Sequence, residues 1–246
     1  MNQSELEDLI RRSLDEFYQR RIKKLSELKL QNVLRKKNPY LLRAMGVEKA
    51  SEIVEEILKA FMSSSDESIF GDAFFETVAK LSSGGVVAPS EGVDVALETD
   101  TVYKAIAVKS GPSIFNASQA KRQDQEFRSL GSRLLKLHKR FDPLLGHGYG
   151  RRFADPTKDR SYRIRSGQAF WEELTGDPDF YVKLIELMRD YPQQHRLLFK
   201  EEWDRATNRF ELDFLNNFGN PDGSIHWEKL VRYNSGKDQV KWIGRK

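Results

Sequence analysis

The sequence contains no cysteine, which excludes disulfide bonds, zinc sites built from thiolates and cysteine nucleophiles. It has no apolar run of about 18 residues, so we expect no membrane-spanning helix. Its acidic, amphipathic start, MNQSELEDLI, is unlike a secretory signal. Histidine is scarce, with 4 residues spread along the chain, which argues against a metal centre at His147. These absences predict a soluble, cytoplasmic protein.

Positive charge is in excess and is unevenly placed. The formal net charge is +4 and the sequence pI is about 9.1. Between residues 121 and 165, 13 Lys and Arg stand against 5 Asp and Glu. Such a basic cluster indicates a polyanionic partner. The alternative is a set of solvated helix faces, and charge alone does not decide between the two.

The chain reads as three consecutive regions. Apolar residues three and four apart predict a helical region over residues 1–62. Residues 63–166 combine helices with short strands, and residues 167–246 are mainly helical. We expect one compact α/β domain, with a central mixed sheet of four to six strands flanked by helices.

Two details of the helix assignment bear on this architecture. The polar stretch Ser63–Glu67 predicts a linker between a helix at 47–62 and another at 67–81, with Glu76 on the second. Glu76 shares a stripe with apolar residues, so it either reaches a site or is solvated. Farther along, the pattern predicts separate helices at 192–208 and 210–218.

Residues 92–112, GVDVALETDTVYKAIAVKSGP, predict two β-strands joined by a polar turn. The first carries Asp94 between two valines, and the second ends on Lys109. Alternation along the second strand directs Ile106 and Val108 to the core and the intervening residues to the other face. If the strands pair, a carboxylate and an ammonium lie side by side. Phosphodiester hydrolysis uses such groups: a carboxylate to bind Mg²⁺, and a lysine to stabilise charge or help deprotonate the attacking water.

This hairpin resembles the PD-(D/E)xK nuclease superfamily, in which an aspartate on one strand precedes an acid-x-lysine on the next. Asp94 matches the first position and Lys109 the last, whereas Ala107 occupies the position of the middle acid. Glu98 shares a strand face with Asp94 but lies roughly 13 Å away at ~3.3 Å per residue, too far for one ion. The resemblance favours Glu76, because members often place a glutamate on the preceding helix.

Asp124 and Glu126, on the helix after the hairpin, are the weaker choices for the missing acid. The resemblance continues from about residue 38 to 235, where the order of motifs is similar to type II restriction endonucleases, and most similar to a PmeII-like group. The motifs are Asn38-Pro39-Tyr40, Ser68-x-x-Gly71-x-x-x-Phe75-Glu76, Gly92-Val93-Asp94, Val108-Lys109-Ser110-Gly111-Pro112, Gly167-Gln168-Ala169-Phe170-Trp171, Thr175-Gly176-Asp177 and Gly223-x-Ile225-x-Trp227-x-x-Leu230.

The resemblance implies a restriction-endonuclease-like core and a homodimer that cuts double-stranded DNA at a short, near-palindromic site with Mg²⁺. It also implies a host methyltransferase that protects the same site. In this reading Asp94 and Glu76 bind the metal and Lys109 assists the attacking water. Two alternatives stay open: a structure-specific repair or defence nuclease, and a non-catalytic DNA-binding protein derived from a nuclease.

A polar series after Lys109 is the predicted DNA-contacting segment. Asn and Gln can pair with adenine, and Arg with guanine, in the major groove. The alternative is a helix N-terminus that binds phosphate only through its backbone amides. The residues are Ser110, Ser113, Asn116, Ser118, Gln119, Lys121, Arg122 and Gln123.

Overall fold

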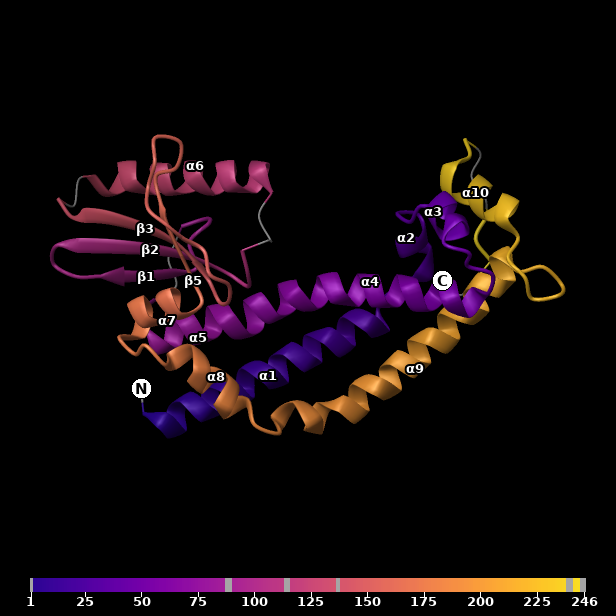
Figure 1. Ribbon diagram of the computed structural model, residues 1–246, viewed down its shortest axis with the longest axis horizontal. Coiled ribbons are helices and arrows are strands. Elements are labelled where there is room, and N and C mark those ends of the chain that lie inside the picture. The colour runs from indigo at the N-terminus through magenta and orange to yellow at the C-terminus, as the bar shows by residue number, and fades with distance from the viewer. Residues whose placement is uncertain (1, 87–89, 113–115, 136–137, 238–240, 244–246) are drawn as a thin grey trace. The chain divides into compact units, whose positions relative to one another are not determined.

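The computed structural model describes residues 2–86, 90–112, 116–135, 138–237 and 241–243, which form helices and one β-sheet (Figure 1). They divide into two compact units: unit 1 is Met1–Phe17 with Glu67–Pro192, and unit 2 is Tyr18–Asp66 with Gln193–Lys246. The helices are α1 (Gln3–Ser26), α2 (Leu30–Leu34), α3 (Pro39–Ala44), α4 (Ala50–Phe70), the π-helix η1 (Gly71–Glu76), α5 (Thr77–Ser82), α6 (Ala117–Leu134), α7 (Gln168–Thr175), α8 (Phe180–Met188), α9 (Tyr191–Phe218) and α10 (Trp227–Ser235). None of those in the described ranges has an apolar stretch long enough to cross a membrane.

Unit 1 contains a mixed sheet whose strand order is β1-β2-β3-β5-β4. Strand β2 is antiparallel to β1 and parallel to β3, β5 is parallel to β3, and the short β4 is antiparallel to β5. This sheet, flanked by helices, confirms the predicted α/β fold. The strands are β1 (Val95–Glu98), β2 (Val102–Lys109), β3 (Arg140–His147), β4 (Phe153–Ala154) and β5 (Arg163–Ser166).

Helices cover both faces of the sheet, with α6 on one side and α5 and α7 on the other (Figure 1). Ile106 and Val108 pack with Trp171 in one core, while Ala105 and Ala107 pack with the α6 residue Phe127 in a second core. The prediction that only one face of β2 is buried is therefore wrong. A strand covered on both faces is apolar on both, so simple alternation misassigns it.

The polar stretch Ser63–Glu67 is helical, so the predicted linker is wrong. Helix α4 runs without a break through it and continues as η1 and α5. Serine and aspartate lower helix propensity by only a fraction of a kcal/mol each, which tertiary contacts outweigh. Ser65 is buried, and Asp66 accepts from Arg21 at 2.8 Å. In the same way, α9 is one helix where two were predicted.

Unit 2 is helical and has a core of its own. Phenylalanines 210, 214 and 218, spaced by four on α9, put one buried face on that helix. This face packs with apolar residues of α4 and of the shorter helices. Fully buried members of the core include Leu25, Leu30, Leu34, Ile53, Val54, Ile57, Leu58, Phe210 and Phe214.

A network of charged side chains joins α7 to the sheet of unit 1. Arg163 on β5 donates to Asp142 on β3 at 2.8 Å and to Glu173 on α7 at 2.6 Å. Lys104 on β2 donates to Glu173 at 2.9 Å. Burial raises the pKa of Glu173, but the hydrogen bonds from Arg163 and Lys104 outweigh it and lower that pKa to about 2. The network therefore stabilises the fold only while Glu173 is ionised.

We predict that Glu173→Gln destabilises unit 1 at neutral pH by about 2–3 kcal/mol, because two cations lose their shared partner. Because folding lowers the pKa of Glu173, its ionised carboxylate stabilises the folded state fully above the ordinary pKa of 4.5. This stabilisation is lost as the pH falls toward 2. Urea unfolding across this window should show a smaller pH dependence for the variant. Glu172→Gln, at the exposed neighbouring position on α7, is the matched control; equal effects of the two changes would contradict the prediction.

Candidate functional site

Asp94, Glu76 and Lys109 meet at the C-terminal end of β2. The Lys109 Nζ lies 3.5 Å from Asp94 Oδ2 and 4.0 Å from Glu76 Oε1. The three side chains are 24%, 29% and 30% exposed, so each is half-buried but reachable from solvent. The structure thus brings together the three residues that the sequence singled out, from three different elements.

Asp94 immediately precedes β1 and is held by the pairing of β1 with β2. Its N–H donates to the Ile106 carbonyl at 2.9 Å, and its Oδ2 accepts from the Val108 N–H at 2.7 Å. The carboxylate takes the place of a backbone acceptor in the sheet, so its orientation is coupled to the strand that carries Lys109. The other oxygen, Oδ1, has no hydrogen-bond partner within the described part of the chain.

Glu76 is the last residue of η1, where the chain leaves α-helical geometry. Single π-helical turns inside helices are frequent at functional sites. Phe74 is fully buried beneath the sheet, and the Phe75 ring lies 6.1 Å from that of Trp171. A Cβ added at Gly71 would lie 3.4 Å from Ser110 Cβ, so η1 packs closely on the segment that follows β2. This packing brings Glu76 to Lys109.

His147 ends β3 and pairs in register with Lys109. Its side chain is 1% exposed; Nδ1 lies 2.8 Å from Ser166 Oγ, and Nε2 has no partner among the described residues. Burial, assisted by the charges of Arg152 and Lys109, lowers the pKa of His147 to about 4. The imidazole is therefore neutral beside the Lys109 ammonium at physiological pH.

Two residues that the sequence analysis did not single out contact the segment after Lys109. The Ser110 hydroxyl donates to Glu67 Oε2 at 2.6 Å, and the Tyr149 hydroxyl donates to Glu67 Oε1 at 3.2 Å. Glu67 was assigned to a linker, so no sequence signal placed it near the site. Its carboxylate links the ends of β2 and β3.

Besides Arg122, four of the predicted DNA-contacting residues have hydrogen-bond partners inside the protein. Ser110 is buried and bonded as described, and Gln123 is buried with its Nε2 donating to the Gly92 carbonyl at 2.7 Å. Asn116 and Gln119 form a reciprocal capping box at the start of α6. Contacts from these side chains to DNA would require them to exchange these bonds.

Three other predicted contacts, Ser118, Lys121 and Arg122, are exposed on the first turns of α6. Arg122 Nε donates to Glu126 at 2.8 Å. Ser113 lies outside the described residues. The structure thus places part of the predicted segment on an open helix surface.

The alternative acids have partners of their own. Asp124 Oδ1 accepts from the Ser161 backbone N–H at 2.6 Å, Glu126 binds Arg122, and Glu98 accepts from Lys139 at 2.6 Å. No cluster of three or more His, Asp or Glu that could hold a metal occurs within the described residues. Two carboxylates suffice for Mg²⁺, which prefers oxygen ligands and keeps several waters. The pair Asp94 and Glu76 fits that requirement.

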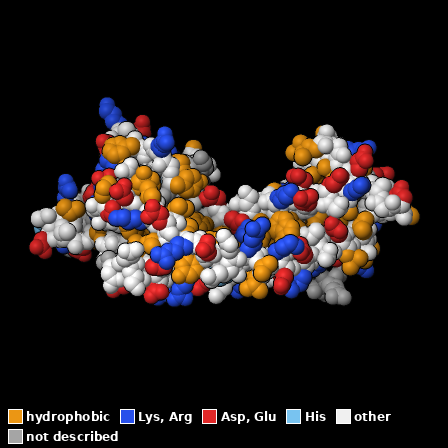
Figure 2. Space-filling view, turned by 60° about the horizontal axis from the view of Figure 1, so that its bottom comes forward, with side chains coloured by type: hydrophobic (Ala, Val, Ile, Leu, Met, Phe, Trp, Pro, Cys, Tyr) orange, Lys and Arg blue, Asp and Glu red, His pale blue; other side chains and the backbone are white. Residues whose placement is uncertain are grey.

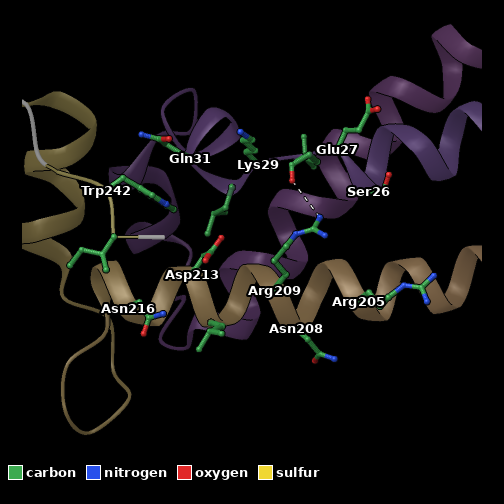
Figure 3. Close-up of a pocket in the computed structure, with 14 residues that line it drawn as sticks. Ser26, Glu27, Lys29, Gln31, Arg205, Asn208, Arg209, Asp213, Asn216 and Trp242 are labelled. Atoms are coloured by element: carbon green, nitrogen blue, oxygen red, sulfur yellow. Dashed lines mark hydrogen bonds between the residues drawn. The ribbon is translucent and has the colours of Figure 1, made fainter. Parts of the chain in front are cut away.

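A separate pocket of about 1440 Å³ lies within unit 2, between the end of α1 and α9 (Figure 3). Arg209 lines this pocket and donates to the Leu25 and Leu28 carbonyls at 3.2 and 3.4 Å. Cations such as Lys29 and acids such as Glu27 line it together. None of the predicted site residues belongs to this pocket, so it is not part of the candidate site.

Comparison with family models bears on the activity of the whole chain and not on individual residues. A family model described as type II restriction endonuclease EcoO109I matches residues 4–195 of the chain. The match covers most of the chain and includes Glu76, Asp94 and Lys109. A search of curated proteins found no match.

We predict that acid destabilises the fold partly through His147. Because folding lowers the pKa of His147, the folded state favours the neutral imidazole. The stabilisation from this residue is therefore complete above the ordinary pKa of 6.5 and is lost as the pH falls toward about 4. The contribution is at most about 3 kcal/mol. In urea unfolding over this window, His147→Asn should flatten the pH dependence, although the smaller side chain lowers stability at every pH.

The matched control is His138→Asn at an exposed histidine, where asparagine tolerates the positive φ of 53°. This control should keep the wild-type pH dependence. An unchanged pH dependence in His147→Asn would contradict the assignment of a neutral, buried imidazole.

Proposed function

Because the chain belongs to the EcoO109I family of type II restriction endonucleases, we propose that unit 1 hydrolyses duplex DNA at a short specific site with Mg²⁺. The observation that carries this proposal is the approach of two carboxylates, Asp94 and Glu76, to the ammonium of Lys109. Carboxylates for a hard cation and a cation for the phosphate are the minimal set for this reaction.

Asp94 and Glu76 would hold the metal. A bound Mg²⁺ would polarise a non-bridging phosphate oxygen and lower the pKa of a coordinated water. Because Val108 fixes Asp94 Oδ2, the carboxylate is oriented before substrate arrives, with Oδ1 available as a ligand. Such preorganisation avoids reorganisation at the moment of reaction.

Lys109 would bind the scissile phosphate and assist the attacking water. Its ammonium lies at the end of β2 and is 30% exposed, so it is open to a polyanion. A hydrogen bond from Nζ stabilises negative charge as it develops on phosphorus oxygens.

We further propose that the site is a variant of the PD-(D/E)xK arrangement in which Glu76 replaces the middle acid. Ala107 is fully buried in the core under α6, and Glu76 approaches Lys109 from η1 instead. The grouping with PmeII-like enzymes stays a prediction. So does the assignment of residues 63–166 as the nuclease core.

Recognition of DNA would involve the exposed start of α6, where Ser118, Lys121 and Arg122 are open to solvent. A near-palindromic site would be read most simply by a homodimer, because a twofold protein matches a twofold sequence. A host methyltransferase for the same site and a cytoplasmic location complete the proposal.

The direct test is incubation of the protein with phage DNA and Mg²⁺. We expect discrete fragments that disappear when EDTA removes the metal, and at least a 100-fold loss of rate in Lys109→Ala. Nicking that depends on DNA structure would indicate the repair or defence nuclease instead. Binding without cleavage would indicate the non-catalytic protein, and a Lys109→Ala variant as fast as wild type would show that the site lies elsewhere.

The role of the acids can be tested against an acid on the same hairpin. Asp94→Asn and Glu76→Gln should each lower the cleavage rate by at least about 100-fold. Glu98→Gln, whose carboxylate binds Lys139, should cleave at the wild-type rate. A fully active Glu76→Gln would remove Glu76 from the site, and thermal melting of each variant separates loss of chemistry from loss of fold.

A further inference from the structure

We propose that the turn Gly148–Arg152, which follows β3, is a preformed clamp for the DNA backbone, with Arg151 and Arg152 binding phosphates that flank the scissile one. This inference rests on the proposed nuclease site, because the turn begins beside Lys109. It extends the proposed contact surface to a second segment, beyond the one that follows β2.

The position of the turn follows from the backbone hydrogen bonds that continue the sheet. The Gly148 N–H donates to the Lys109 carbonyl at 2.9 Å, and the Tyr149 N–H donates to the Ser110 carbonyl at 3.2 Å. The chain thus leaves the sheet one residue beyond the paired Lys109 and His147. At no more than about 3.6 Å per residue, Arg151 lies within about 15 Å of this pair, a span of a few phosphates along one DNA strand.

The turn is held in one conformation from several sides. The Gly148 carbonyl accepts from the Trp171 indole N–H at 2.8 Å, and a Cβ at Gly148 would lie 2.5 Å from the Phe75 ring. Gly150 has a φ of +108°, which strongly favours glycine. A Cβ at Gly167 would lie 2.5 Å from the Gly150 carbonyl oxygen, so the residue between β5 and α7 is in close contact with the turn. The two arginines are therefore presented from a fixed backbone, which lowers the entropic cost of binding.

No acid in the described part of the chain pairs with these two arginines. Both are exposed, and neither makes a hydrogen bond or an ion pair from its side chain within the described ranges. By contrast, Arg163 and Arg165, a dozen residues later, are paired with acids. Arg152 is close enough for its charge to lower the pKa of the buried His147.

A duplex backbone is the partner that best fits this arrangement. Guanidinium groups bind phosphate oxygens through two parallel hydrogen bonds, and consecutive arginines can bind neighbouring phosphates. Such contacts fix the position of the DNA without reading its sequence. On the face of the molecule in Figure 2, acidic and basic side chains are interspersed. Local cations without acidic partners can direct DNA to the site.

The test is the salt dependence of binding to a mixed-sequence DNA duplex, measured by fluorescence anisotropy in EDTA so that no cleavage occurs. Each phosphate contact contributes about 0.9 to the slope of log Kd against log salt concentration. Arg151→Ala and Arg152→Ala should each lower the slope by about 1, and the double variant by about 2. Arg152→Lys should retain most of the wild-type slope, because it keeps the charge.

The matched control is Arg140→Ala. Arg140 is also exposed, but it begins β3 at the end away from Lys109, so its removal should leave the slope unchanged. Equal slopes for Arg152→Ala and Arg140→Ala would overturn the proposal. The binding assay does not depend on cleavage: a wild-type protein that never cuts DNA but shows the predicted slopes would refute the nuclease, and would support the two arginines as phosphate contacts but not their place beside a scissile phosphate.

Discussion

The hydrogen bond from the Val108 N–H to the Asp94 carboxylate is the interaction on which the site depends. It ties the acid to the residue just before Lys109, so the sheet sets the position of the carboxylate relative to the backbone of Lys109. Because the carboxylate replaces a backbone acceptor, the same contact completes the pairing of β1 with β2. One hydrogen bond thus both completes the strand pairing and orients the Asp94 carboxylate before any ligand binds.

Packing of aromatic residues likewise fixes the position of the helix that carries the second acid, Glu76. Phe74 and Trp171 are buried beneath the sheet, and the ring of Phe75 in η1 lies against Gly148, which begins the turn after β3. The π-helix η1 and the turn Gly148–Arg152 thus both pack against the same aromatic residues. Interiors are close-packed and resist small displacements. A shift of η1 would consequently move Glu76 and Gly148 together, which couples the acidic and basic sides of the site.

The cations of unit 1 fall into groups with different partners. Lys104 and Arg163 are paired with acids on α7 and the sheet, and they hold the layers together. Lys109 is shared by two half-buried carboxylates. Arg151 and Arg152 form no ion pair among the described residues. The pairing of each cation thus distinguishes those that stabilise the fold from those available to a polyanion. Composition alone could not make this distinction.

The sequence by itself determined the mixed α/β architecture and the hairpin that carries Asp94 and Lys109, because both rest on local patterns: apolar periodicity, and two strands joined by a short turn. It also determined Glu76 as a candidate, through resemblance and not through geometry. Only the tertiary structure decided that Glu76 approaches Lys109, that Ser110 and Gln123 are buried, and that α4 and α9 continue where breaks were predicted. The physical reason is that burial and side-chain pairing join residues far apart in the chain, such as Glu67 with Ser110 and Tyr149. No local pattern records those contacts.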